Sequence, residues 1–167
     1  VKLRQHSVKI IYNVIPGIEG CTMSIIASPK LGASFVQYVG TALPGGGTVA
    51  PFAQEPGVEA FLYVMDGAGA LTAATCGQSE VLSPGSYVFS PAGKGLVFSN
   101  TTNAPVRFLL YKQRYTALPG HEAEAVFGNT ATMEERIYED MANVFIRDLL
   151  PTHLGFDMNM HTLSFDP

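Results

Sequence analysis

The sequence predicts an all-β protein whose strands form a barrel or a sandwich. Short runs rich in Val, Phe, Tyr and Leu follow one another between turns that contain Gly and Pro. Before residue 130, no run combines apolar residues at helical spacing with capping residues, which argues against alternating strands and helices. A chain of 167 residues is long enough for one well-buried core, or for one domain plus part of another.

Seven runs in the first 115 residues have strand character, because β-branched and aromatic residues dominate them. In chain order they cover residues 22–28, 34–43, 59–67, 69–75, 79–91, 95–100 and 106–115. Turn sequences such as PGGG, DGAG, SPG and NTTNAP punctuate them. We therefore expect residues 1–115 to form a first domain, a β-barrel.

The composition changes beyond this point. Residues 116–135 are polar, contain Pro and Gly and carry acidic residues, which is typical of a surface linker. In residues 136–167, VFIRDLL predicts a strand that ends at Pro151, with a short helix around EDMANV as the alternative, and LGFDMNMHTLSFDP predicts another strand. Because isolated strands leave unpaired edges, we expect residues 136–167 to be the truncated start of a second domain.

Composition excludes several classes of protein. Hydrophobic residues make up 47% of the chain and charged residues 14%, a balance that disordered chains do not have. A net charge of −4 without a Lys/Arg cluster argues against nucleic acid as a partner. No apolar run approaches the ~20 residues of a membrane span and no leader is visible, so we expect a soluble protein. Cys21 and Cys76 are expected to be reduced, with a disulfide as the alternative.

One hairpin carries a recognisable frame. The sequence GSYVFSPAGKGLVFSN resembles the second signature segment of the cupin superfamily, which consists of small jelly-roll β-barrels. Gly85, Pro91, Gly93 and Asn100 fall on the family's positions. Leu96 stands where metal-binding cupins have a histidine ligand. The resemblance implies a cupin fold with an altered site.

The first signature segment departs further from the cupin pattern. Counting back from the glycine that ends FLYVMDG, the family's glutamate position falls on Ala60, and AQEPG upstream contains no histidine. Glu59 lies one residue away, so on a strand its side chain points to the opposite face. The resemblance therefore implies that this barrel offers no ligand set for Mn, Fe or Zn, and we assign no metal ligand in it.

Several segments narrow the resemblance. LGASFVQYVGTALPGGG, GVEAFLYVMDG, NVFIRDLLP and FDMNMHTLSFDP together resemble the (S)-ureidoglycine aminohydrolase family, whose members are two-cupin enzymes. The resemblance implies that this chain is the first half of a bicupin, with a metal-free N-terminal barrel. It also implies that Mn²⁺ is bound in the C-terminal cupin, by one glutamate, two histidines and a glutamine that follow the FDMN segment and are not in this chain.

The family resemblance also implies a reaction. It is the hydrolytic release of ammonia from (S)-ureidoglycine to give (S)-ureidoglycolate, a step of allantoin and purine catabolism, with the metal as Lewis acid and template. These residues alone are then expected to be inactive. The alternatives are a non-catalytic cupin for oligomerisation or small-ligand binding, and a different bicupin enzyme such as a dioxygenase or sugar isomerase. A homo-oligomer is expected, located in the cytoplasm of a bacterium or the endoplasmic reticulum of a plant.

Three polar residues are candidates for contact with a small-molecule substrate. On the strand expected from FDMNMHTLSF, Asp157, Asn159 and His161 share one face, and the intervening Phe and Met residues share the other. If the polar face looks into the second barrel, it contacts the ureido or carboxylate group of the substrate. The alternative is that the polar residues form hydrogen bonds between the units and the methionines fill the core. No catalytic residue is assigned.

Overall fold

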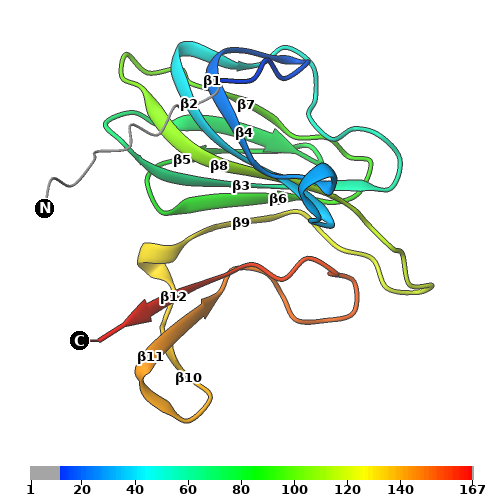
Figure 1. Ribbon diagram of the computed structural model, residues 1–167, viewed down its shortest axis with the longest axis vertical. Helices are drawn as coiled ribbons and strands as arrows, with labels where there is room; N and C mark the ends of the chain where they lie inside the picture. Colours follow the sequence, from blue (N-terminus) through cyan, green and yellow to red (C-terminus); the bar gives the residue numbers. More distant parts are fainter. Residues whose placement is uncertain (1–11, 167) are drawn as a thin grey trace, which may run out of the picture.

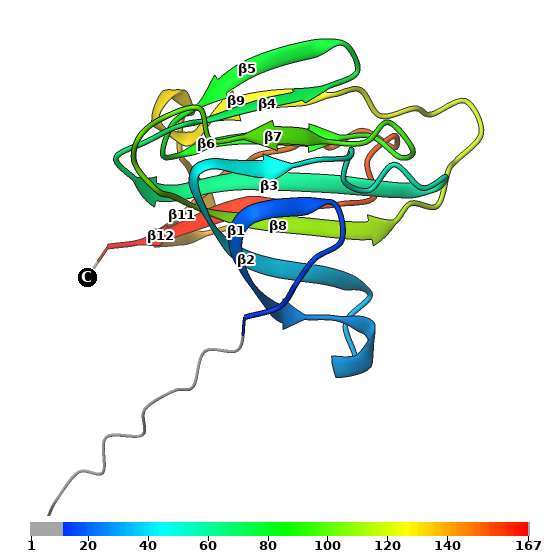
Figure 2. The same cartoon turned by 90° about the horizontal axis from the view of Figure 1, so that it is seen from above.

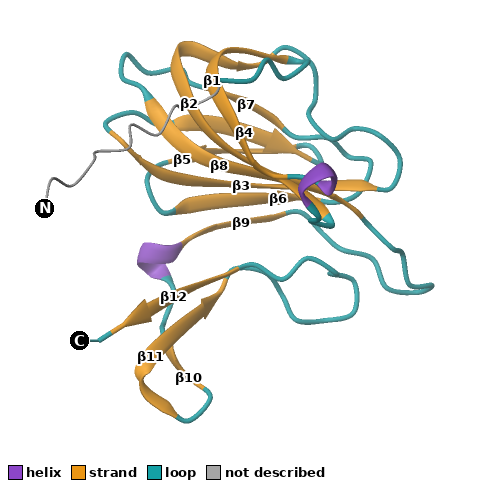
Figure 3. Cartoon of the chain, viewed as in Figure 1, coloured by secondary structure: helices purple, strands orange, loops and turns teal. Residues whose placement is uncertain are grey.

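The computed structural model describes residues 12–166, which are almost entirely β-structure (Figure 3). The predicted all-β fold class is confirmed. The elements in order are β1 (Ile18–Ala27), η1 (Pro29–Leu31), β2 (Phe35–Thr48), β3 (Val58–Gly67), β4 (Leu71–Thr75), β5 (Gln78–Leu82), β6 (Ser86–Ser90), β7 (Val97–Ser99), β8 (Val106–Arg114), β9 (Val126–Asn129), η2 (Thr130–Thr132), β10 (Arg136–Tyr138), β11 (Met141–Asp148) and β12 (His161–Phe165). Within this part of the chain, no helix is long and apolar enough to cross a membrane.

A nine-stranded antiparallel sheet curls around one core (Figures 1 and 2). Its strand order is β5-β4-β7-β2-β8-β3-β6-β9, and β1 pairs with β2. The central strands β2, β8 and β3 are long and regularly paired, with Phe35 opposite Gln113 and Glu59 opposite the same glutamine. Gln113 therefore lies in the middle of three adjacent strands.

The sequence PGGG was expected to be a turn, but it lies inside β2, which runs on to Thr48. The glycines allow other strands to come unusually close. A Cβ atom at Gly46 would overlap the carbonyl group of Gly20 on β1, and one at Gly47 would overlap the carbonyl group of Phe98 on β7. These glycines are needed for close backbone approach rather than for a change of chain direction.

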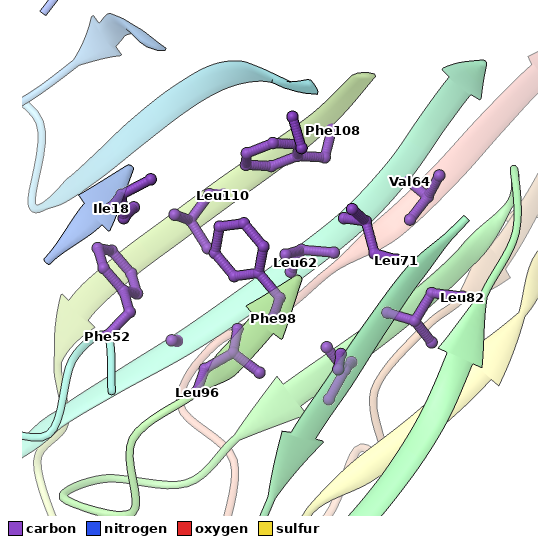
Figure 4. Packing of buried hydrophobic residues seen from close by; sticks show 14 of the residues in the cluster. Ile18, Phe52, Leu62, Val64, Leu71, Leu82, Leu96, Phe98, Phe108 and Leu110 are labelled. Carbon is purple, nitrogen blue, oxygen red and sulfur yellow. The ribbon is translucent and has the colours of Figure 1, made fainter. Parts of the chain in front are cut away.

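The core inside the barrel is mainly hydrocarbon (Figure 4), and it also holds the buried hydroxyl groups of Thr75 and Ser90, which hydrogen-bond to each other (2.7 Å). The alternation of β3 turns Ala60, Leu62 and Val64 inward, and all three are fully buried. The outward residues Glu59 and Phe61 are buried too, because a second unit covers that face. The continuous burial from Glu59 to Leu62 thus has two causes, the barrel core on one side and the second unit on the other.

A three-stranded antiparallel sheet, β10-β11-β12, forms the second unit and lies on the side of β6 and β9 (Figure 1). Residues 116–135, expected to be a linker, include strand β9, which pairs with β6 and so extends the first sheet. Strand β11 confirms the strand predicted from VFIRDLL, and the alternative helix around EDMANV is wrong. The division into domains at residues 115 and 136 stays a prediction.

Candidate functional site

Two of the positions where metal-binding cupins place ligands are filled by hydrocarbon. Leu96 and Ala60 are both 0% exposed and belong to the barrel core. The main chain of Leu96 exchanges two hydrogen bonds of 2.8 Å with Phe52, which fixes the leucine at the end of the barrel interior. Figure 4 shows Leu96 next to Phe98 in this interior.

These residues do not fit a metal ion. Aliphatic side chains have no donor atoms, whereas Mn²⁺ and related ions need carboxylate, imidazole or amide oxygen and nitrogen ligands. Within residues 12–166, no group of three or more His, Cys, Asp or Glu side chains is placed to hold an ion. We therefore derive no chemical step from a metal in this barrel.

A polar cluster lies on the outer face of the barrel instead. Glu59 on β3 points away from the core, as its position next to Ala60 predicts, and is 1% exposed. The side-chain amide of Gln113 donates one hydrogen bond to Glu59 Oε1 (2.9 Å) and one to Asp157 Oδ1 (3.0 Å). Asp157 Oδ2 accepts a third bond from the Thr116 main-chain amide (3.0 Å). We call Glu59, Gln113 and Asp157 the carboxyl cluster.

The electrostatics of the carboxyl cluster favour a neutral Glu59. Together these surroundings raise the pKa of Glu59 to about 8: burial is the largest cause, the hydrogen bonding and negative charge of Asp157 also raise the pKa, and the Gln113 hydrogen bond lowers it. Glu59 Oε2 is buried and has no hydrogen-bond partner among the described residues. An ionised carboxylate in that state would lack compensation, so the proton stays on Glu59 at neutral pH.

Two of the three candidate substrate-binding residues border one cavity, and the third lies apart from it. Asp157 is tied to the carboxyl cluster, and Asn159 lines a cavity of about 230 Å³ that Asp157, Gln113 and Tyr111 also border. His161 does not border this cavity; it opens β12, directly opposite Asp148, and is exposed.

The expectation that residues 156–160 form a strand is wrong, because β12 begins only at His161. The predicted alternation of exposure nevertheless holds. Met158 is buried, while Asp157 and Asn159 are exposed.

The contacts of this segment fit the alternative interpretation of its sequence. Met158 is 6% exposed and packs in a second hydrophobic cluster, whose other buried members are Phe61, Tyr87, Phe89, Leu149 and Leu150. Phe156 packs its ring against Phe89 at 5.1 Å between centroids. Asp157 bonds to the barrel and its following loop rather than pointing into free space. Contact with a substrate stays a prediction for all three residues.

Sequence reasoning missed two residues of the carboxyl cluster. It considered Glu59 only as a metal ligand, and it did not consider Gln113 at all. One signal was present, because the glutamate in GVEAFLYV stands within a continuous apolar run and such a carboxyl is expected to be buried. The partner was not visible, since Gln113 is 54 residues away and only the strand register brings it opposite Glu59.

Comparison with known proteins supports the cupin fold. A family model described as "Cupin domain" matches residues 41–111. Residues 41–111 therefore form a cupin domain within the all-β barrel, and Leu96 and Ala60 are buried at two positions where the resemblance to metal-binding cupins implies ligands.

Within the cupins, the resemblance to (S)-ureidoglycine aminohydrolases is confirmed. The chain is 43% identical, over 95% of its length, to the (S)-ureidoglycine aminohydrolase of Escherichia coli (strain K12), and 26% identical, over 94%, to that of Arabidopsis thaliana. It superposes on the crystal structure of protein Ylba from E. coli with a TM-score of 0.85 and 40% identity, over 95% of this chain.

The chain matches only part of each of these proteins. It spans 59% of the E. coli enzyme, 50% of the Arabidopsis enzyme and 61% of the Ylba chain. The activity of such a longer protein is therefore a matter for proposal.

Proposed function

We propose that the protein containing this chain hydrolyses (S)-ureidoglycine. Water replaces the amino group, so that ammonia leaves and (S)-ureidoglycolate remains, a step of allantoin and purine catabolism. The observation that carries the proposal is the 43% identity to the E. coli enzyme of that name across nearly all of this chain. Leu96 and Ala60, at two positions where the resemblance implies metal ligands, support the further proposal that this half of the protein is a scaffold.

The first barrel acts as a scaffold in this proposal. Its interior is closed by apolar side chains such as Leu96, Leu62 and Phe98, which can neither bind a metal nor exchange a proton. The Mn²⁺ expected for this reaction would be bound by residues outside this chain, where it would orient the substrate and stabilise developing charge. The barrel's outer face supports the segment that carries the candidate substrate-binding residues.

Asp157, Asn159 and His161 are proposed to contact the substrate. A carboxylate accepts hydrogen bonds from ureido N–H groups, and an amide or imidazole can donate to a substrate carboxylate. The cavity beside Asn159 has room for a small polar group and is bordered by the Asp157 and Gln113 side chains. Asn159 is the clearest candidate of the three, because Asp157 already accepts two hydrogen bonds from the barrel side.

The test is ammonia release from (S)-ureidoglycine by the full-length protein supplied with Mn²⁺. We expect turnover, and absence of ammonia release in the presence of the metal would contradict the proposal. The variant Asn159→Ala is expected to raise KM several-fold. The matched control is Asn103→Ala, which alters an exposed asparagine in the turn before β8 and is expected to leave KM unchanged.

Two further predictions accompany this function. A homo-oligomer is proposed, because the second unit leaves apolar side chains such as Phe165 (66% exposed) and Ile137 (52% exposed) uncovered in this chain. Size-exclusion chromatography with light scattering on the full-length protein tests it. The compartment is proposed to be the cytoplasm in a bacterium or the endoplasmic reticulum in a plant, and fractionation of the source organism tests that.

A further inference from the structure

The carboxyl cluster joins two parts of the molecule through one nitrogen atom. Glu59 and Gln113 belong to adjacent barrel strands, whereas Asp157 belongs to the irregular segment 156–160 between β11 and β12. The Gln113 side-chain nitrogen donates both of its hydrogens, one to each carboxyl group. Removal of segment 156–160 from the barrel would break the bond to Asp157 and uncover Glu59.

The two carboxyl groups cannot both ionise without penalty. Glu59 Oε1 and Asp157 Oδ1 accept hydrogen bonds from the same nitrogen and therefore lie within about 6 Å of each other. At that distance two negative charges strongly disfavour each other. Both Asp157 oxygens accept hydrogen bonds, which stabilises its charged form. Glu59 Oε2 is buried and has no hydrogen-bond partner within residues 12–166. The geometry therefore assigns the single proton of the pair to Glu59.

The groups that face this pair add no positive charge. On β8, Lys112 and Arg114 flank Gln113 and therefore point to the opposite side; Lys112 lies 5.4 Å from the centre of the Phe52 ring and 3.7 Å from Glu55. On β2, the residue opposite Gln113 is the uncharged Phe35. On β6, the outer-face residue is the uncharged Phe89, which pairs with Phe61.

The loop after β8, which contains His121, supplies no ion-pair partner to either carboxyl group among the described residues. It contributes Tyr115, whose pKa is raised by burial and then by the negative charges of Asp157, Glu59 and Glu122. Within residues 12–166, neither Glu59 nor Asp157 forms an ion pair with a Lys, Arg or His side chain. A proton is thus the available means of neutralising the pair.

We propose that Glu59, Gln113 and Asp157 form a one-proton latch that holds segment 156–160 on the outer face of the first barrel. In the docked state Glu59 carries the proton and Met158 fills the second hydrophobic cluster. In the open state Glu59 is exposed to water and ionises at its ordinary pKa. Docking therefore takes up one proton, and rising pH favours the open state. The latch does not depend on the proposed reaction.

The pH range of the latch follows from the two states. The pKa of Glu59 is about 8 when docked and 4.5 when exposed. Between these values the docked state holds one more proton, so the docking equilibrium constant falls tenfold for each unit of pH. Below about pH 4.5 and above about pH 8 it is independent of pH.

Amide hydrogen exchange in the full-length protein measures docking directly. The Thr116 amide donates to Asp157 Oδ2 across the boundary between the barrel side and the segment, so this amide is protected by the docked segment. After correction for the intrinsic exchange rate, we expect protection at Thr116 to fall about tenfold per unit between pH 5 and 8. Glu59→Gln, a neutral isostere, is expected to make protection independent of pH. Glu55→Gln, which alters an exposed glutamate in the loop between β2 and β3, is the matched control and should keep the wild-type slope.

Two results would overturn the latch: wild-type protection without pH dependence, or the same slope in Glu59→Gln as in the wild type. A measurement on the unmutated protein guards against a variant that fails to fold. In a ¹³C titration of the carboxyl groups, Glu59 is expected to have its midpoint near pH 8, and a midpoint near 4.5 would refute the proposal. Asp157→Asn is expected to lower the Glu59 midpoint, which a merely structural role for Asp157 would not do.

Discussion

Truncation of Leu96 tests whether this residue, at a position where metal-binding cupins have a ligand, stabilises the first barrel as part of its core. The side chain is 0% exposed and lies in the hydrocarbon core with Phe52 and Phe98. Leu96→Ala removes three carbon atoms, worth about 2.5 kcal/mol at about 0.8 kcal/mol per buried methylene. The cavity left between the aromatic rings adds to this, so the expected loss of unfolding free energy is about 3 to 4 kcal/mol.

Urea denaturation followed by far-UV circular dichroism is the assay. The midpoint is expected to fall while the slope of free energy against urea concentration stays unchanged, because the same surface is exposed on unfolding. Val97→Ala is the matched control, since Val97 is the next residue on the chain and is 41% exposed; its expected cost is below about 1 kcal/mol. Equal costs for the two substitutions would refute the claim that Leu96 is a core residue rather than part of an open site.

Three further predictions address other parts of the structure. Glu59→Gln is expected to stabilise the protein by up to about 3 kcal/mol at pH 7 but by less than about 1 kcal/mol at pH 5. Between pH 4.5 and about 8 the folded wild type must hold a proton that the unfolded chain releases, so its stability falls as pH rises. Urea unfolding at both pH values measures the effect, and an equal effect at both would contradict the prediction. Gly47→Ala is expected to lower the melting temperature by several degrees, because the new Cβ atom overlaps the Phe98 carbonyl group. In the control Gly45→Ala the Cβ atom lies in open space, and only the positive φ of 78° opposes the substitution. A smaller loss at Gly47 than at Gly45 would show that β2 and β7 can separate freely. Leu96→His restores the imidazole of metal-binding cupins, but it is expected to destabilise the barrel because it buries a polar group. It is not expected to add a Mn²⁺ site, because Ala60 still supplies no ligand. An extra equivalent of bound Mn²⁺ in isothermal titration calorimetry would contradict this prediction.

The strands and the cupin frame could be predicted because both depend on local chemistry. Apolar and aromatic runs ended by Gly, Pro and Asn define strand segments wherever turns are conventional, and Gly85 with φ of 87° divides β5 from β6 as a turn residue should. The PGGG segment was misjudged because the prediction used local sequence alone. Its glycines are required by neighbouring backbones that come from residue 20 and residue 98, and local sequence does not show those neighbours.

The carboxyl cluster could not be predicted, because it depends on strand register and on a loop that docks from far along the chain. Gln113 meets Glu59 through the pairing of β3 with β8, and Asp157 arrives from a segment that has no regular structure. Segment 156–160 keeps the side-chain alternation that suggested a strand. It has no neighbouring strand to pair with, because hydrophobic contacts of Met158 and hydrogen bonds of Asp157 hold it on the barrel instead.

The central claim is that the first barrel is a scaffold and that the metal chemistry takes place outside it. Anomalous diffraction at the manganese edge, from crystals of the full-length protein grown with Mn²⁺, locates the ion directly. The account predicts an anomalous peak in the part of the protein beyond residue 167 and none within the barrel. A peak beside Leu96 and Ala60 would contradict it.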